Sequence, residues 1–257
     1  MIHQAASLIK FLRVSTNKHG VHSPFVYGLV TKCFNDKTKF PGYAVMRSHK
    51  RTLKLDKALI QVNDQGQGSR VFKGPNRKIS TLSRKVGMKK KRQKLLFRLG
   101  RYLECETILE FGTSLGLGTV ALALSNEFAT VDTVEACENT AETAQKYFRK
   151  FGMKNIHIHR ESFQNFLINN PNKKYDLIFI DGDHNGERTF QYFEKLLNNV
   201  HNNSVIIFDD IYWSKDMTEA WKKIITHEKV QVSIDTFQWG MVFFRKEQAK
   251  EHFVIRV

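Results

Sequence analysis

The sequence predicts an α/β fold in which a mostly parallel sheet is covered by helices on both faces. From residue 107 onward, short apolar runs alternate with segments whose apolar residues recur at helical spacing, which is the order expected of such a sheet. A glycine-rich turn follows the first apolar run, and acidic residues stand where several later runs end. Open parallel sheets bind ligands at the carboxyl ends of their strands, so the turn and the acids predict where the functional site lies.

The individual elements follow from the same patterns, taken in chain order. Strands are predicted at 108–111, 130–135, 156–159, 175–180 and 204–208, with a hairpin at 230–237 and 240–245 and a last short strand at 254–256. Helices are predicted at 118–125, 139–151, 162–169, 190–197 and 215–226. The second of these helices, for example, places Ala141, Ala144 and Phe148 on one face.

The residues before the α/β region form a separate predicted part. Residues 1–60 have mainly helical patterns, and Ser23 before Pro24 is a helix-start signal. Residues 61–79 are polar and rich in glycine, which indicates a loop or linker, and a further helix is predicted over 80–101. We therefore divide the chain into a helical and loop extension over 1–79 and an α/β domain over 80–257.

Composition and charge narrow the class of protein. The 257 residues are 41% hydrophobic and 26% charged, no apolar run is long enough to span a bilayer, and the N-terminus lacks a full signal-peptide core. A cytoplasmic protein is therefore expected, with Cys33, Cys105 and Cys137 as reduced structural thiols. Residues 1–107 carry 24 Lys and Arg against 5 Asp and Glu, whereas the remaining residues carry 17 against 20. This asymmetry is typical of a face that binds polyanions such as RNA, although a solvated basic surface stays open as the alternative.

The glycine-rich turn contains Gly112, Gly116 and Gly118, between an apolar run and a predicted helix. Glycine allows a sharp turn and the close approach of a ligand, and a helix N-terminus presents unpaired N–H groups. The spacing is not that of the phosphate loop, and it only approximates the dinucleotide fingerprint. Taken alone, the turn is also compatible with a purely structural role.

Acidic residues lie within or at the ends of four of the predicted strands. They are Glu110, Glu135, Asp181, Asp209 and Asp210. Glu135 follows Gly112 by 23 residues, which is near the spacing at which nucleotide-binding sheets place a carboxylate on ribose hydroxyls. A solvent-facing helix cap is the alternative for this residue.

At this point a family resemblance becomes specific. The segment Glu110-Phe-Gly-Thr-Ser-Leu-Gly116 resembles motif I of the class I S-adenosylmethionine-dependent methyltransferases, and the resemblance extends over about residues 80–257. Within that superfamily, Ile180–His184 and Phe208–Trp213 resemble the small-molecule O-methyltransferase branch, which includes the catechol and caffeoyl-CoA types. Residues 19–26 and 64–70 resemble a bacterial subgroup of these enzymes. The resemblance implies a Rossmann-like fold with a seven-stranded sheet and an antiparallel C-terminal hairpin strand.

The resemblance also implies roles for individual residues. Around the donor S-adenosylmethionine it places Gly112, Thr113, Ser114 and Gly116 on the methionine part, Glu135 on the ribose, and Glu161 and Ser162 near the adenine. Glu110 and Asp181, two of the strand-end acids, are assigned to the same donor site. Asp181 and His184 are the candidate catalytic residues, His184 as a base near neutral pH, with a histidine that satisfies loop backbone groups as the alternative.

A metal site is predicted from three carboxylates. In the catecholic branch an Asp and an Asp-Asn pair hold Mg²⁺ against the substrate, and here Asp181 and Asp209 match while Asp210 replaces the Asn. Converging carboxylates without a cation repel one another, and Mg²⁺ or another divalent cation with oxygen ligands relieves this. Because adjacent strand residues point to opposite faces, one of Asp209 and Asp210 is also compatible with a structural role.

The predicted function is methyl transfer from S-adenosylmethionine to an oxygen of a small molecule, with a divalent metal as an optional aid. An oxygen acceptor is favoured because motifs for methylating base amino groups or pyrimidine carbons are missing. Two alternatives stay open: an RNA methyltransferase that uses basic residues 1–107, and a catalytically silent module that binds nucleic acid or protein. His19, His22, Ser69 and Arg70 are candidates for a lid, or for plain caps and turns; Tyr212, Trp213 and Trp239 are candidates for the acceptor pocket or the core. A homodimer is left open.

Overall fold

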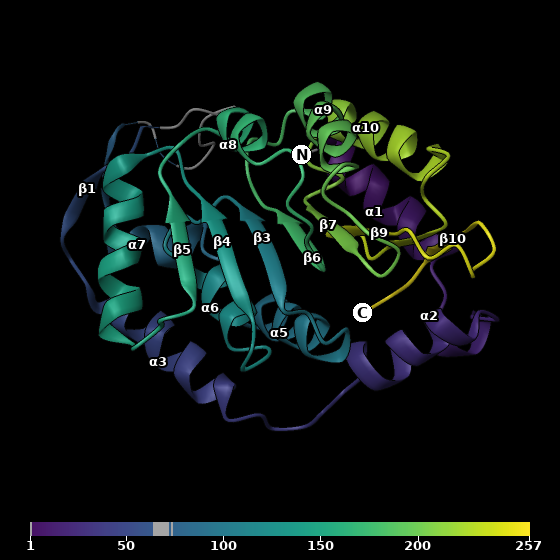
Figure 1. Ribbon diagram of the computed structural model, residues 1–257, viewed down its shortest axis with the longest axis horizontal. Coiled ribbons are helices and arrows are strands. Elements are labelled where there is room, and N and C mark those ends of the chain that lie inside the picture. Colours follow the sequence, from purple (N-terminus) through teal and green to yellow (C-terminus); the bar gives the residue numbers. More distant parts are fainter. Residues whose placement is uncertain (1, 64–71, 73) are drawn as a thin grey trace. The chain divides into compact units, whose positions relative to one another are not determined.

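The computed structural model describes residues 2–63, 72 and 74–257 (Figure 1). The chain divides into two compact units, one made of residues 1–35 and 167–257 and the other of residues 36–166. In the part of the chain that the structure describes, no helix is both long and apolar enough to cross a membrane.

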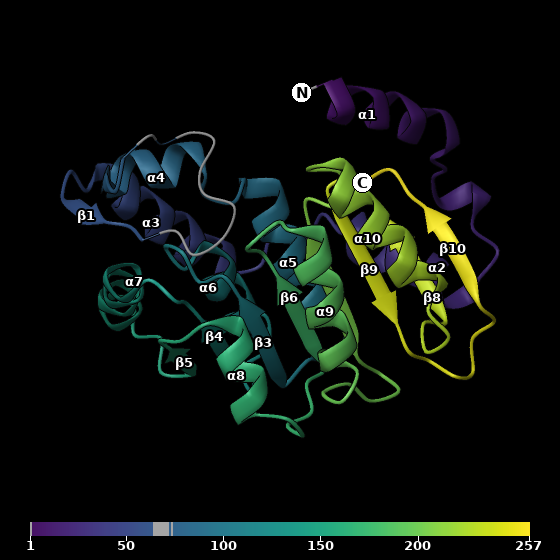
Figure 2. The ribbon, with the colours of Figure 1, turned by 90° about the horizontal axis from the view of Figure 1, so that it is seen from above.

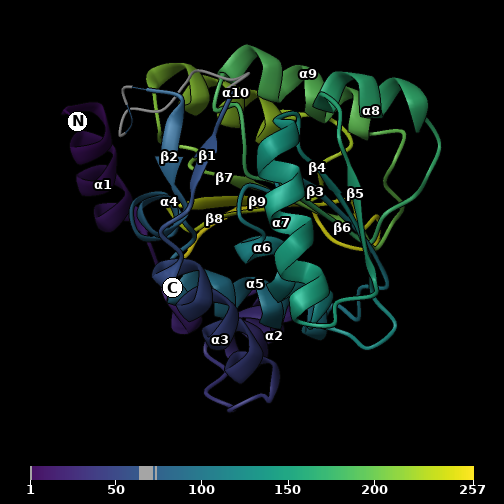
Figure 3. The same cartoon turned by 90° about the vertical axis from the view of Figure 1, so that its left-hand side faces the viewer.

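The unit of residues 36–166 contains three parallel strands in the order β3, β4, β5. These strands are β3 (Thr107–Phe111), β4 (Thr130–Val134) and β5 (Ile156–His159). The helices are α3 (Gly42–Leu55), α4 (Ile79–Lys85), α5 (Lys90–Tyr102), α6 (Leu117–Ala123) and α7 (Glu138–Lys150), and α8 (Phe163–Asn169) begins here. A short antiparallel hairpin, β1 (Leu59–Gln61) with β2 (Asn76–Lys78), lies beside α7 (Figure 3).

The unit of residues 1–35 and 167–257 contains five strands in the order β10, β8, β9, β7, β6. They are β6 (Leu177–Ile180), β7 (Val205–Asp209), β8 (Val232–Asp235), β9 (Trp239–Phe243) and β10 (Glu251–Val254). Its helices are α1 (Ile2–Val14), α2 (Pro24–Leu29), α9 (Gly186–Leu196) and α10 (Lys215–Thr226), with a 3₁₀ turn at Lys18–Gly20 and a π turn at Val30–Phe34. Helices α9 and α10 lie side by side (Figure 2).

The predicted fold class is confirmed: the strands are mostly parallel, and β9 runs antiparallel to both β7 and β8 as the expected hairpin strand. All residues of β6 and β7 are buried, which is typical of parallel strands covered on both faces. Within the described residues, β10 adds an edge strand parallel to β8 beyond the seven that the resemblance implies. The final strand thus lies a few residues before the predicted 254–256.

Two predictions before residue 107 are wrong. Part of the predicted linker forms the β1–β2 hairpin, because Ile60 and Val62 pack against the apolar cluster that contains Leu115 and Leu117. The helix predicted over 80–101 is two helices, α4 and α5. The break lies at Gly87, where a Cβ would stand 2.7 Å from the Ser83 carbonyl oxygen and from a Leu117 methyl carbon, so the chain turns there and α5 begins anew.

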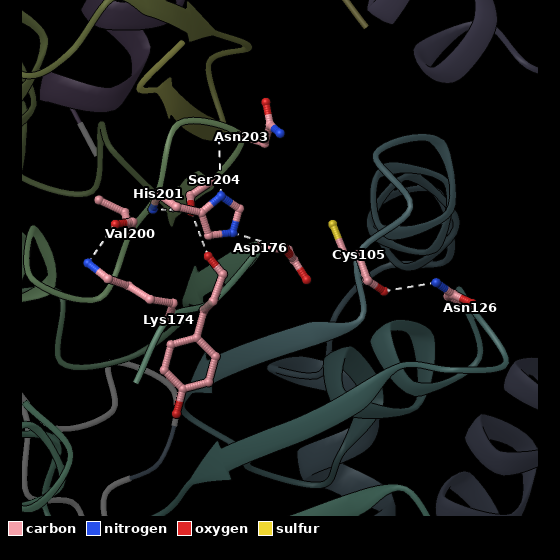
Figure 4. Close-up of polar contacts among 9 residues, drawn as sticks. Cys105, Asn126, Lys174, Asp176, Val200, His201, Asn203 and Ser204 are labelled. Atoms are coloured by element: carbon pink, nitrogen blue, oxygen red, sulfur yellow. Dashed lines mark hydrogen bonds and ion pairs between the residues drawn. The ribbon is translucent and has the colours of Figure 1, made fainter. Parts of the chain in front are cut away.

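The starts of β6 and β7 are tied together by the loop after α9 (Figure 4). Nε2 of His201 lies 2.9 Å from Oδ1 of Asp176, and the Ser204 hydroxyl donates to the Tyr175 carbonyl at 2.6 Å. The Lys174 ammonium donates to the Val200 carbonyl at 3.0 Å. This polar cluster is at the amino ends of the strands, away from the ends that carry Asp181 and Asp209, so we assign it to structure.

Candidate functional site

The glycine loop, residues 112–116, connects β3 to α6 within the unit of residues 36–166. Gly112 and Gly116 have φ values of 100° and 72°, and Ser114 has φ of 48°, so the loop uses the left-handed region three times. A Cβ on Gly116 would lie 2.2 Å from the Phe148 ring. The loop is pinned to β4 because the Gly112 N–H donates to the Val134 carbonyl at 3.0 Å. Position 116 therefore needs glycine for both conformation and space.

A buried polar network lies beneath the glycine loop. The hydroxyls of Thr119 on α6 and Thr133 on β4 both donate to Oε2 of Glu110, the latter at 2.7 Å. The hydroxyl oxygens of Thr113 and Thr133 lie 2.6 Å apart. Burial raises the pKa of Glu110 to about 7, against the lowering effect of the two threonine hydroxyls. The network joins β3, the glycine loop, β4 and α6 into one rigid platform.

Glu135 stands directly after β4 and faces the glycine loop. Its Oε2 accepts a hydrogen bond from the Ser114 N–H at 2.9 Å, and its Oε1 accepts one from the Cys137 N–H at 3.0 Å. Backbone donors therefore orient the carboxylate from both sides. The structure brings Gly112, Thr113, Ser114, Gly116 and Glu135 together in one place, and their roles toward a donor stay a prediction.

The β1–β2 hairpin contacts the turn after Glu135, and sequence reasoning missed this. The Asn63 N–H donates to the Cys137 thiol at 3.3 Å, and the Asn139 side chain donates to the Gln61 carbonyl at 3.0 Å. The partners are more than 70 residues apart in sequence, so no local sequence pattern predicts these contacts. The contact links the extension before residue 80 to the acid that faces the glycine loop.

Glu161 and Ser162 follow β5 in the same unit. The Ser162 hydroxyl accepts a hydrogen bond from the Asn165 N–H at 3.2 Å and thus caps α8. The next residue, Phe163, stacks on Phe111 of β3 with the ring centroids 4.6 Å apart. The place of these residues near an adenine stays a prediction.

The other unit holds the second group of predicted residues. Asp181 comes directly after β6, and Asp183 and His184 both have positive φ in the turn that follows. The Asp183 carboxylate pairs with Arg188 and accepts a hydrogen bond from the Tyr192 hydroxyl at 3.0 Å. Burial raises the pKa of Asp183, opposed by the Arg188 charge. Asp183 therefore stabilises the turn that presents His184, whose ring lies 5.5 Å from that of Trp213.

Asp209 and Asp210 take different roles at the end of β7. Asp209 is the last strand residue and is buried, and its Oδ1 accepts a hydrogen bond from the Trp239 indole at 2.8 Å. Asp210 has φ of 50°, and its N–H donates to the Gln238 carbonyl at 2.7 Å. Since Ile180 pairs with Phe208, Asp181 and Asp209 follow at matching positions of neighbouring strands. In the described part of the chain no group of three Asp, Glu, His or Cys residues could hold a metal ion, and the metal site stays a prediction.

The remaining candidates are partly placed. Trp239 is buried in the core, and the Tyr212 hydroxyl donates to buried Asp235. His19 and His22 are exposed; Asn17 caps the turn at His19, and Ser23 caps α2 as predicted. Ser69 and Arg70 of the predicted lid lie outside the described residues.

The geometry agrees with comparisons with known proteins. Residues 109–211 match the family described as "Methyltransferase domain". No curated protein matches the chain. Among solved structures, the chain is similar to an O-methyltransferase from Bacillus cereus in complex with S-adenosylhomocysteine, at 18% identity and a TM-score of 0.54, covering 80% of this chain and 91% of that one.

Two further structures give the same fold. A Podospora anserina methyltransferase bound to S-adenosylhomocysteine matches at 11% identity and a TM-score of 0.61, over 87% of this chain and 97% of that one. An O-methyltransferase of tomaymycin synthesis from Streptomyces achromogenes, in complex with S-adenosylmethionine, matches at 14% identity and a TM-score of 0.56, over 80% and 91%. Residues 109–211 are thus similar to a methyltransferase domain. The chain as a whole shares the α/β fold of these three structures.

Proposed function

We propose that this protein transfers a methyl group from S-adenosylmethionine to an oxygen of a small-molecule acceptor. The observation that carries the proposal is the pairing of the glycine loop with Glu135 through the Ser114 N–H. A carboxylate held in this way can accept both ribose hydroxyls of the donor, and the loop backbone can approach the methionine part without meeting a Cβ. Similar solved structures hold S-adenosylmethionine or S-adenosylhomocysteine, which supports this choice of donor.

Methyl transfer needs alignment more than acid–base help, because the sulfonium is already activated. The glycine loop and Glu135 fix the donor, and holding an acceptor oxygen in line with the methyl group supplies most of the rate enhancement. We assign His184 as the base that takes the acceptor proton. Glu161 and Ser162 are proposed on the adenine side of the donor.

Asp181 and Asp209 fit a divalent cation best, because they are hard oxygen ligands at matching ends of β6 and β7. Asp210 is the third carboxylate of the site predicted from the sequence, but because the described residues contain no group of three such ligands placed to hold an ion, the proposal rests on Asp181 and Asp209. A cation held by these residues would lower the pKa of the acceptor hydroxyl.

Calorimetric titration tests the donor site directly. The purified chain is titrated with S-adenosylmethionine and S-adenosylhomocysteine, with and without Mg²⁺, beside Glu135→Ala and Glu138→Ala. Hydrogen bonds to a charged group contribute about 1.5–3 kcal/mol each, so Glu135→Ala should weaken binding at least about tenfold. Glu138 lies in the first turn of α7 and pairs with Arg160, so its variant should bind as the parent does. No binding by the folded parent would refute the enzyme and favour a silent binding module.

Methyl transfer to RNA is the second candidate, favoured by the excess of basic residues over 1–107. The same titration followed by a screen of acceptors in 50 and 300 mM salt separates the two. Phosphate contacts weaken steeply with salt, whereas turnover of an uncharged small acceptor should change little.

A further inference from the structure

A dense group of cations covers α3 and α5 in the unit of residues 36–166. We call it the basic face and define it by Arg47, Arg51, Lys89, Lys90, Lys91 and Lys94. All are exposed except Lys94, which is half-buried. The Lys94 ammonium lies 4.3 Å from the centroid of the Tyr43 ring on α3, so α3 and α5 meet at this surface. The neighbouring charges of Lys90, Arg98 and Arg47 lower the pKa of Lys94, after the larger effect of burial, which agrees with that placement.

The stretch of sequence that carries this surface is poor in acids. Residues 42–102 contain 18 Lys and Arg but only Asp56 and Asp64 as acids. Asp56 is engaged by the Tyr147 hydroxyl, and Asp64 lies outside the described residues. Helix α5 has no acid in its first turn, where Lys90 to Arg92 stand against the positive end of the helix dipole. By contrast, α7 in the same unit carries acids in its first half and bases in its second. The arrangement on α5 is unfavourable until an anion neutralises it.

The extent of the face indicates a polyanion rather than a single phosphate. Lys89 to Lys94 span about 8 Å at the start of α5, at about 1.5 Å per residue, and Arg47 and Arg51 lie one turn apart on α3. Six cations divided between two helices are more than one phosphate can engage. The apolar residues of α5 are all buried, so this helix has nothing to insert into a bilayer. The rings of Tyr43 and Phe40 are covered by Lys94 and Arg101, at 4.3 and 5.0 Å from the centroids, which leaves phosphates rather than stacked bases as the groups recognised.

The basic face is attached to the glycine loop. The buried side chain of Gln93, on α5, donates to the carbonyl of Leu117 at 2.8 Å. Leu117 is the first residue of α6 and follows Gly116 of the glycine loop. A polyanion on α5 is therefore held next to the loop to which we assign the methyl donor.

We propose that the basic face binds RNA through its phosphate backbone. The inference goes beyond methyl transfer, since the binding does not require RNA to be the acceptor. It predicts affinity with little sequence preference and a steep dependence on salt.

The test uses the full chain without any methyl donor. Fluorescence anisotropy measures its affinity for a labelled single-stranded RNA of 20 nucleotides, from 50 to 300 mM NaCl, for the parent and two triple variants. One is Arg47→Gln with Lys90→Gln and Lys91→Gln. The control, Lys222→Gln with Lys229→Gln and Lys246→Gln, removes three exposed lysines of the other unit and changes the net charge equally. Sedimentation with phosphatidylglycerol vesicles and calorimetry with S-adenosylmethionine complete the set.

We expect the first variant to bind RNA at least about tenfold more weakly at 150 mM salt, with a salt slope lower by about 2 to 3, while the control matches the parent. The first variant should also unfold at a slightly higher temperature, because it relieves repulsion at the start of α5. RNA affinity that is equal in both variants, or vesicle binding in preference to RNA, would overturn the proposal. Donor binding is recorded separately, so failure of the basic face and failure of the proposed donor site give different results.

Discussion

Two glycines with similar positive φ angles allow the effect of crowding beneath the glycine loop to be separated from backbone strain. Gly116 has φ of +72° and Gly152, at the end of α7, has φ of +68°. A Cβ on Gly116 would stand 2.2 and 2.5 Å from two carbons of the Phe148 ring, whereas a Cβ on Gly152 would meet nothing within 4 Å. Alanine at either position carries the same backbone strain, but only at 116 does it also carry a clash.

The expected magnitudes follow from these two terms. A left-handed non-glycine residue costs about 1–2 kcal/mol, and overpacking a core adds about 1–3 kcal/mol. Phe148 is 3% exposed, so its ring has no open space into which to move. We therefore expect Gly152→Ala to lower the free energy of unfolding by about 1–2 kcal/mol and Gly116→Ala by about 2–5 kcal/mol.

Urea unfolding of both variants, with calorimetric titration of S-adenosylmethionine, checks the reasoning. Gly116→Ala should also weaken donor binding, and Gly152→Ala should not. Adding Phe148→Leu to Gly116→Ala should recover part of the lost stability, although Phe148→Leu alone is destabilising. Equal losses of stability in the two alanine variants would show that Phe148 gives way freely and would refute the steric argument.

Three further predictions concern buried polar groups. Burial raises the pKa of Glu110 to about 7 from 4.5, so between these pH values the folded state holds a proton that the unfolded state has lost. The stability contributed by this group therefore falls as pH rises from about 4.5 to 7. Glu110→Gln should remove that fall in melting curves recorded from pH 5 to 8. His49 is fully buried beside the rings of Tyr147 and Phe151, and neither of its nitrogens has a hydrogen-bond partner among the residues that the structure describes. Burial lowers its pKa to about 4. His49→Leu should therefore stabilise the fold by about 1–2 kcal/mol near pH 7, and by more as pH falls from 6.5 to 4, where the parent protein loses stability; an unchanged urea midpoint would contradict this. Trp239→Phe removes the indole donor to buried Asp209 and should lower the free energy of unfolding by about 1–3 kcal/mol. Trp213→Phe, at a half-buried position, should lower it by less when both variants are unfolded in urea.

Much of the parallel sheet was predictable because its signals are local. The runs that form β3, β6 and β7 are nearly continuous in apolar residues, and the predicted bounds of α10 coincide with those observed. The segment before residue 107 was harder. The three-residue strand β1 pairs with β2 because distant residues cover it, and periodicity cannot register a contact of that kind.

The same distinction applies to the candidate site. The meeting of Ser114 with Glu135 was predictable because strand, turn and helix lengths fix the separation of consecutive strand ends. The hydrogen bonds that Asn63 and Gln61 make with Cys137 were not predictable, because they join segments that share no sequence pattern. The metal ligands remain an inference from the residue types and from their positions at strand ends. The sequence places three acids there, but it does not indicate that the Trp239 indole donates a hydrogen bond to Asp209.

The buried threonines beneath the glycine loop have a practical consequence for engineering. Because Glu110, Thr119 and Thr133 shape the loop from below, its upper surface consists of backbone and of the exposed side chain of Ser114. The side chain at position 114 can thus be changed without removing the residues that support the loop. Libraries at this position, with the supporting residues left intact, are a route to variants that accept donor analogues with altered sulfonium substituents while keeping the parent scaffold.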